Sequence, residues 1–200
     1  MSNFNVERKQ KADKYLAEQI RICSRIFQCA PEDFRLPTQA EDFNGVDLFY
    51  GKIRIALRVR HRQLKDLTLR LSKDKNGISE LEKIMNQNMD YILQCESDKL
   101  RPEKINTWDL FDVQELLPAL DSELVSKQEF NLSSDKHFVC YSIDDLSKYF
   151  PRSFLARGVT IEEEILNDDD GTVRVQPRRV TLFHLRVICG QETTASTPKV

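Results

Sequence analysis

Helical spacing of apolar residues marks the first part of the chain. Leu16, Ile20, Cys23 and Phe27 recur every three or four residues, with Lys, Glu and Arg between them. This period is typical of an amphipathic helix, and Pro31 cannot continue one. We therefore expect a long helix over residues 5–28.

Alternation with a period of two follows. Residues 45–50 and 52–60 alternate apolar and polar side chains around Gly51, which predicts a β-hairpin, and residues 67–71 alternate again as a third strand. The segment Ser79-Glu80-Leu81-Glu82 then has the form of a capping box, which predicts a short helix to about residue 86.

The second half of the chain carries shorter patterns. They predict, in order, strands at 89–96 and 105–111, a helix at 113–120 interrupted by Pro118, a strand at 138–143 leading into a helix to 150, an Asp-Gly turn at 170–171, a last strand at 182–189 and a frayed tail at 191–200.

This order predicts an α/β domain, with α+β as the other option, built on a mixed β-sheet flanked by helices. We expect a single domain over residues 1–190, with its core at about 5–112 and a C-terminal extension at about 113–190.

Composition narrows the class of protein. The chain has 200 residues and a formal net charge of −2, enough for about one domain with its own core. It has no apolar run long enough for a membrane span, no secretory signal pattern and no Cys-x-x-Cys pair. We therefore expect a cytoplasmic protein without a disulfide framework or a zinc site.

Charge is unevenly distributed along the chain. The segment 52–70 holds seven basic residues against one acid, Asp66, and the acids gather later, at 162–164 and 168–170. A basic stripe on a weakly acidic protein indicates a local anion site rather than a general nucleic-acid coat. The basic residues of the stripe are Lys52, Arg54, Arg58, Arg60, Arg62, Lys65 and Arg70.

The hairpin is the best candidate for chemistry, since no Gly-rich phosphate loop, nucleophile elbow or His-Glu-x-x-His motif is present. With a two-residue turn at 50–51 or 51–52, one face carries Asp47, Phe49, Arg54, Ala56 and Arg58, and the opposite face is the apolar core face. A three-residue turn would move Asp47 to the core face.

The following helix adds Glu80 and Lys83, which lie on neighbouring faces at a spacing of three. Two carboxylates with a nearby cation suit metal-assisted phosphodiester hydrolysis, because carboxylate oxygens bind Mg²⁺ and the cations offset charge on the phosphate.

These residues resemble the active-site motif of the PD-(D/E)XK nuclease superfamily, whose restriction-endonuclease-like fold runs helix, strands, helix, strand. That family places an Asp on one hairpin strand and an acid-x-Lys on the next, here Asp47 and Ile55-Ala56-Leu57-Arg58. Ala56 stands where the family has its acid, and Arg58 where it has Lys. Some members move the acid to the following helix, which points to Glu80, and some use an acid of the first helix, here Glu18.

The resemblance implies a hydrolase that cleaves DNA with Mg²⁺ or Mn²⁺. Asp47 and Glu80 would then bind the metal, Arg58 and Lys83 would complete the catalytic set, and the DNA would contact Arg54, Arg58, Arg60, Arg62 and Arg70. Arg58 would stabilise charge only, because arginine stays protonated near neutral pH.

Other interpretations stay open. Because of Ala56, the chain could be an inactive nuclease-like protein that binds nucleic acid or a protein partner, and it could form a homodimer. It could also be an interaction module with no nucleic-acid role that uses its acidic C-terminal half. Asp47 could be an ordinary strand residue paired with Arg54 or Arg58, and Glu80 an ordinary acid in the first turn of a helix.

Overall fold

The computed structural model describes residues 3–60, 65–73, 77–97, 104–132, 137–161, 165–167, 173–175 and 179–185. The acidic residues at 162–164 and 168–170, the Asp-Gly turn at 170–171, the last four residues of the strand expected at 182–189 and the 191–200 tail lie outside these residues, as does Arg62.

The main β-sheet is mixed, as expected, and has seven described strands in the order β1-β2-β3-β5-β6-β9-β12. Strands β3 and β5 are parallel, and every other neighbouring pair is antiparallel. The strands are β1 (Phe34–Arg35), β2 (Leu48–Tyr50), β3 (Ile53–Arg60), β5 (Tyr91–Ser97), β6 (Ile105–Asp112), β9 (Phe154–Ile161) and β12 (Arg179–Leu185).

A second sheet of three strands has the order β4-β8-β7, with β4 at Asp66–Arg70, β8 at His137–Ser142 and β7 at Lys127–Asn131. The expectation that residues 67–71 extend the hairpin as a third strand of the same sheet is wrong. Strand β5 lies beside β3 instead, so β4 pairs with β8, and the Gln94 side chain of β5 donates to the Asp66 carbonyl at 2.7 Å. Alternation predicts a half-buried strand but does not say which sheet it joins.

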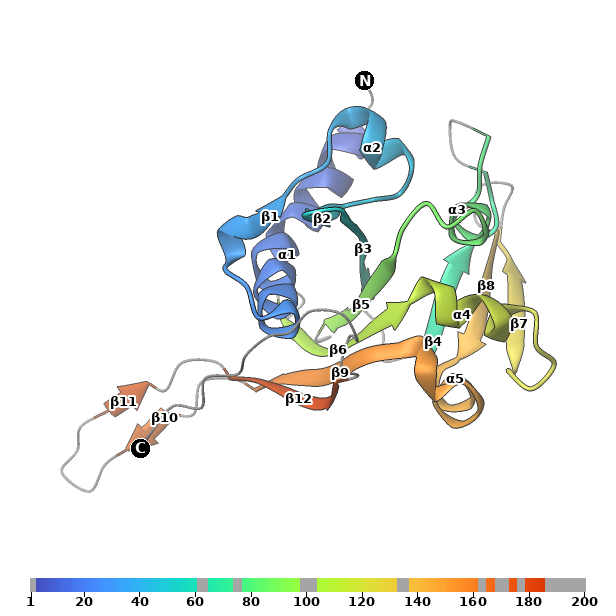
Figure 1. Cartoon of the computed structure of the whole chain (residues 1–200). Coiled ribbons are helices and arrows are strands. Elements are labelled where there is room, and N and C mark those ends of the chain that lie inside the picture. Colours follow the sequence, from blue (N-terminus) through green and yellow to red (C-terminus); the bar gives the residue numbers. More distant parts are fainter. Residues whose placement is uncertain are drawn as a thin grey trace.

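A separate antiparallel pair, β10 (Ile165–Asn167) and β11 (Val173–Val175), projects away from the two sheets (Figure 1).

Helices cover both faces of the main sheet (Figure 1). The long helix α1 (Asn3–Phe27) lies on one side, and α3 (Glu80–Met85), α4 (Val113–Leu120) and α5 (Ile143–Tyr149) lie with the second sheet on the other. Short turns of helix complete the described elements: η1 (Pro31–Asp33), α2 (Gln39–Phe43) and η2 (Pro151–Ser153). Pro118 lies inside α4 rather than ending it, because burial of Leu116, Ala119 and Leu120 offsets the lost backbone hydrogen bond.

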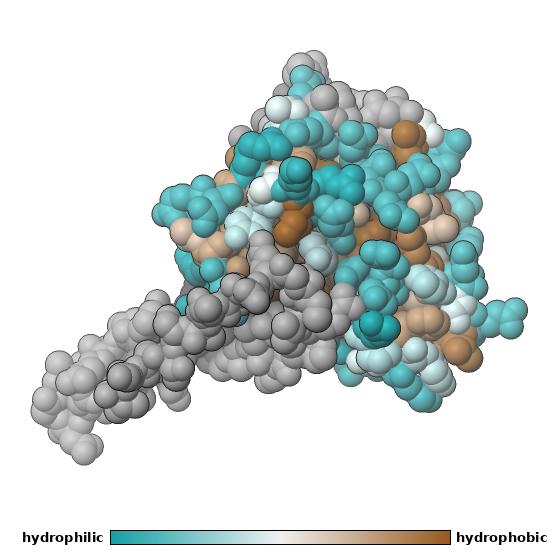
Figure 2. Space-filling model, in the orientation of Figure 1, coloured by the Kyte–Doolittle hydropathy of each residue, from teal (hydrophilic) through white to brown (hydrophobic). Residues whose placement is uncertain are grey.

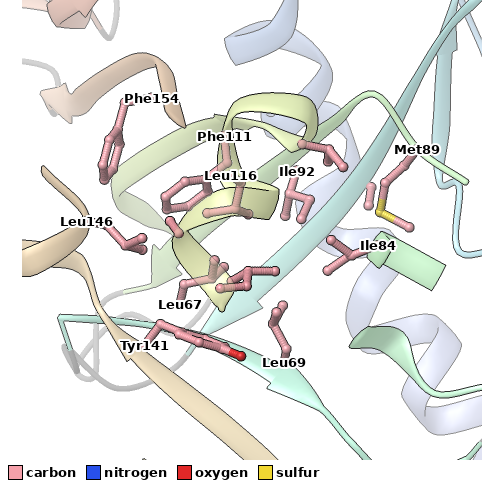
Figure 3. Close-up of a cluster of buried hydrophobic side chains, with 14 of the residues drawn as sticks. Leu67, Leu69, Ile84, Met89, Ile92, Phe111, Leu116, Tyr141, Leu146 and Phe154 are labelled. Atoms are coloured by element: carbon pink, nitrogen blue, oxygen red, sulfur yellow. The ribbon is translucent and has the colours of Figure 1, made fainter. Parts of the chain in front are cut away.

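Two apolar clusters sit on the two faces of the main sheet. The α1-side cluster joins α1 to the sheet through Tyr15, Ile22, Leu48, Ile55 and Trp108 among others. The cluster on the opposite face, which we call the inter-sheet cluster, packs Leu67, Leu69, Ile84, Phe111 and Tyr141 between the two sheets (Figure 3).

The inter-sheet cluster covers part of the hairpin face that the sequence predicted to be open. The expected open face of the hairpin is covered, since Ala56 is fully buried and Phe49 nearly so, both within this cluster. On either side of the covered Ala56, Arg54 and Arg58 stay partly exposed, at 37% and 27%. The second sheet covers this face of the hairpin, and the alternation of the hairpin residues could not reveal that covering.

The exposed surface differs between the two sides of the molecule. In Figure 2 polar colours dominate the side of α1 and β1, and apolar patches lie on the side of α3, α4 and β7. Exposed apolar side chains on or beside β7 include Leu124, Phe130 and Leu132.

Candidate active site

The hairpin positions the first carboxylate. Its turn has two residues, Gly51 and Lys52, which sets Tyr50 opposite Ile53 and Leu48 opposite Ile55. This is one of the two registers considered for a two-residue turn, and the alternative of a three-residue turn does not occur. Just before β2, the Asp47 N–H donates to the Ile55 carbonyl at 2.9 Å.

The Asp47 side chain, rather than a backbone carbonyl, then accepts a hydrogen bond from the β3 backbone. Its Oδ2 accepts the Leu57 N–H at 2.7 Å and a hydrogen bond from Arg58 Nη1 at 3.0 Å. Burial raises the pKa of Asp47 above its ordinary value, and Arg58 and the Leu57 N–H oppose that rise.

The capping box positions the second carboxylate. Ser79 Oγ accepts the Glu82 N–H, and the Glu82 carboxylate accepts the Ser79 N–H at 2.6 Å, so α3 begins where the sequence predicts. Glu80 is the first residue of α3. One of its oxygens accepts from Arg58 Nε and the other from the Arg70 N–H of β4 at 3.0 Å.

Glu80 is only 19% exposed, and burial alone pushes its pKa upward. Arg58, the Arg70 N–H and Arg60 outweigh that effect, and the pKa of Glu80 is lowered. Glu80 is therefore held as a carboxylate at neutral pH.

Arg58 lies between the two acids. Its guanidinium bonds to Asp47 through Nη1 and to Glu80 through Nε, and Nη1 also donates to the Leu57 carbonyl at 2.8 Å. The predicted residues Asp47, Arg58 and Glu80 thus meet in space, although they come from a loop, a strand and a helix. Burial acts to lower the pKa of Arg58, but the nearby carboxylates of Glu80 and Asp47 outweigh it, and the pKa is raised above its ordinary value.

A cavity of about 450 Å³ opens beside this ion triad. Four basic residues line it, Arg58, Arg60, Arg70 and Lys83, and Glu80 lines it as well. Its other lining residues are Gly45, Val59, Thr68, Ser72, Ile78 and Phe138. A concentration of cations around one cavity suits a phosphate or another anion.

Arg60 is held in the wall of the cavity. Its Nη2 donates to the Thr68 carbonyl of β4 at 3.0 Å, which joins the main sheet to the second sheet. Burial lowers the pKa of Arg60, and Glu80 and Asp66 oppose that effect.

Gly45 brings the chain close to Lys83. Its φ of +82° is in the left-handed region, and a Cβ there would come within 3.2 Å of Lys83 Cδ. Glycine at this position therefore allows the loop before Asp47 to pass against α3.

Not every predicted residue belongs to the cavity. Arg54 turns away and forms a two-pronged pair with Asp90, at 2.8 and 3.2 Å. Glu18 lies on α1, on the opposite face of the sheet, where its carboxylate accepts the Ile105 N–H at 3.4 Å. Arg62 falls outside the described residues.

Other lining residues were not predicted from the sequence. Thr68 could have been found, because it is two positions from Arg70 on an alternating strand and so shares its face. Phe138 carries no local signal, since pairing between β4 and β8 brings it to the cavity.

The two carboxylates fit a divalent cation in type and number. Mg²⁺ commonly takes one or two carboxylates and completes its shell with water and phosphate oxygens. Among the described side chains, no group of three or more His, Cys, Asp and Glu could hold a metal ion. Any metal here would rest on Asp47 and Glu80, and Arg58 would have to leave the space between them.

No family model matches the chain, and no curated protein or solved structure matches it either. The resemblance to the PD-(D/E)XK superfamily therefore stays a prediction from the sequence. Within the described part of the chain, no helix has the length and apolar character needed to cross a membrane.

Proposed function

We propose that this protein is a metal-dependent nuclease that hydrolyses DNA phosphodiester bonds at the Asp47–Arg58–Glu80 triad. One observation carries the proposal: two carboxylates from separate elements converge on one guanidinium at a cavity lined by four cations. Carboxylates for a divalent cation and cations for a phosphate are the two components that this chemistry requires.

Asp47 and Glu80 would hold the metal, which when bound supplies Lewis-acid polarisation of the phosphate. Both carboxylates are fixed by backbone donors, the Leu57 N–H and the Arg70 N–H. These bonds keep the two acids in place when Arg58 moves, so the donor pair is preorganised.

The basic residues would bind and neutralise the phosphate. With a metal on Asp47 and Glu80, Arg58 would no longer pair with both acids, and its charge would act on the substrate phosphate. Arg58 cannot serve as a proton acceptor near neutral pH. Lys83, which lines the same cavity, is the second cation available to offset charge as the bond breaks.

A second function is favoured by a specific observation. Arg58 already satisfies both acids, and Ala56, fully buried, contributes no carboxylate. A site of this kind is also consistent with nucleic-acid binding without cleavage.

The test is cleavage of plasmid and linear DNA with Mg²⁺ or Mn²⁺, against EDTA. Wild type runs beside Asp47→Asn, Glu80→Gln and the control Asp90→Asn, which removes a carboxylate from an Arg pair outside the cavity lining. Thermal melting checks that each variant is folded. We expect metal-dependent cleavage in wild type and Asp90→Asn, and its loss in both triad variants.

Cleavage that persists in folded Asp47→Asn would contradict the proposal. No cleavage by wild type, with DNA retention that weakens steeply as salt rises, would replace it with the binding function. In that case Arg60→Ala and Arg70→Ala should weaken retention, and Arg54→Ala should not.

A further inference from the structure

The cavity has two chemically different walls. Arg58, Arg60, Arg70 and Lys83 make it cationic, and Ile78 and Phe138 give it an apolar side, whereas the Val59 side chain packs on the opposite face of the main sheet. A phosphate needs only the first wall. An apolar and aromatic wall beside it suits a nucleobase, because every base has a flat face that stacks on aromatic side chains.

The second sheet extends this arrangement away from the cavity. Arg70 of β4 is directly opposite Phe138 of β8, and Phe138 is directly opposite Phe130 of β7. Directly opposed residues of antiparallel strands place their side chains on the same face. One row across three strands therefore reads cation, aromatic, aromatic.

Both aromatic residues are accessible. Phe130 is 36% exposed and Phe138 is partly buried at the cavity, whereas Leu69 and Val139, on the opposite face of the same sheet, lie in the inter-sheet cluster. The row thus leaves two aromatic rings on the outer face of the sheet, while Leu69 and Val139 pack on its inner face.

The size of the cavity also bears on the substrate. At about 450 Å³ it falls in the range of sites for small ligands, roughly 300–1,000 Å³. A duplex keeps its bases stacked inside and presents only phosphates to such a pocket. An unpaired strand can place a phosphate and a base into it together.

We propose that the substrate is unpaired DNA, a single strand or a frayed strand end, which crosses the outer face of the second sheet. A phosphate lies among Arg60, Arg70 and Lys83, one base stacks on Phe138 and the next on Phe130. This inference rests on the proposed function for the reaction, but the strand preference depends on the β4-β8-β7 row alone.

The experiment measures fluorescence anisotropy of a labelled oligothymidine, the same strand in a duplex, and an abasic strand of equal length, all in EDTA. We expect the oligothymidine to bind about tenfold or more tightly than either of the others, as one stacked base accounts for. Phe138→Leu should remove most of this preference and Phe130→Leu part of it, while Phe138→Tyr retains it.

The matched control is Tyr149→Leu, since Tyr149 is an exposed aromatic residue on α5, outside the second sheet. Melting curves confirm that the Phe138 variants remain folded. Equal binding of single strand, duplex and abasic strand, or no effect of Phe138→Leu in a folded protein, would overturn the inference.

The inference and the proposed function fail separately. Asp47-dependent cleavage of duplex plasmid with no strand preference overturns the inference and keeps the nuclease. A strand preference that depends on Phe138, without any metal-dependent cleavage, keeps the inference and overturns the nuclease.

Discussion

Two arginine–carboxylate clusters lie on the inter-sheet side of the main sheet. They differ in the number of acids for each arginine and in whether they line a cavity. In the first, Arg58 is shared between Asp47 and Glu80 and lines a cavity. In the second, Arg157 of β9 pairs with Asp109 of the neighbouring strand β6 at 2.6 Å and with Ser147 of α5 at 3.2 Å.

The second cluster is one cation for one acid. Asp109 is 15% exposed, and Arg157 also stacks over the Phe154 ring, 4.6 Å from its centre. The pair joins β6, β9 and α5 and lines no part of the cavity. An excess of acid and an adjoining cavity are features that the proposed metal site requires and that the second cluster lacks.

Asp109→Ala is expected to have the largest effect on stability. It leaves the Arg157 guanidinium without its carboxylate partner, but Arg157 is 34% exposed and keeps Ser147, so the free energy of unfolding should fall by about 2–3 kcal/mol. Chemical denaturation measures it. A matched loss in Asp47→Ala, where Arg58 keeps Glu80, would show that the two clusters are equivalent and break the comparison.

The pH dependence of stability should come next. Burial raises the pKa of Asp109 from 3.8 to about 6, with Arg157 opposing the rise. The folded protein then holds a proton that the unfolded chain releases, so stability falls by about 3 kcal/mol as the pH rises from about 4 to about 6.

Asp109→Asn should remove most of that fall, as unfolding measured across this pH range would show. Glu80→Gln should change the pH dependence of stability in the opposite direction, because it removes a carboxylate that stabilises the fold at higher pH. The pKa of Glu80 is lowered, mainly by Arg58 acting against burial, so its contribution to stability is present above its ordinary pKa and is lost as the pH falls through the folded value. If Asp109→Asn leaves the slope unchanged, the assignment to Asp109 is wrong.

Asp47→Asn should have a smaller effect on folding. The amide oxygen can still accept the Leu57 N–H, and Arg58 keeps Glu80, so we expect a loss of about 1 kcal/mol. The same variant should abolish metal-dependent cleavage. Stability and cleavage measured on one preparation sharpen the contrast with Asp109, whose removal costs stability first.

Arg54→Ala should have the smallest effect. Arg54 and Asp90 are each 37% exposed, and such pairs contribute up to about 1 kcal/mol. We expect a small shift in the denaturation midpoint and unchanged DNA retention. Weakened retention in Arg54→Ala would mean that the basic stripe acts as a whole rather than through the cavity.

The sequence by itself determined the parts of the site that depend on short-range chemistry. A two-residue turn at Gly51-Lys52 sets the register that brings Asp47 beside Leu57 and Arg58. The capping box at Ser79 and Glu82 sets the first turn of α3, and with it Glu80. Capping acts over a few residues, which is why the start of α3 could be predicted, along with the mixed sheet and the helices that flank it, whereas the alternation left the turn length open between two and three residues.

Only the tertiary structure decided what surrounds the triad. It moved β4 into a second sheet, covered Ala56 and Phe49, divided the basic stripe between Asp90, the triad and the cavity, and aligned Arg70 with Phe138 and Phe130. These outcomes depend on pairing between strands far apart in the chain. Alternation shows that a strand has two faces, but packing against distant partners decides which sheet the strand joins and which face stays open.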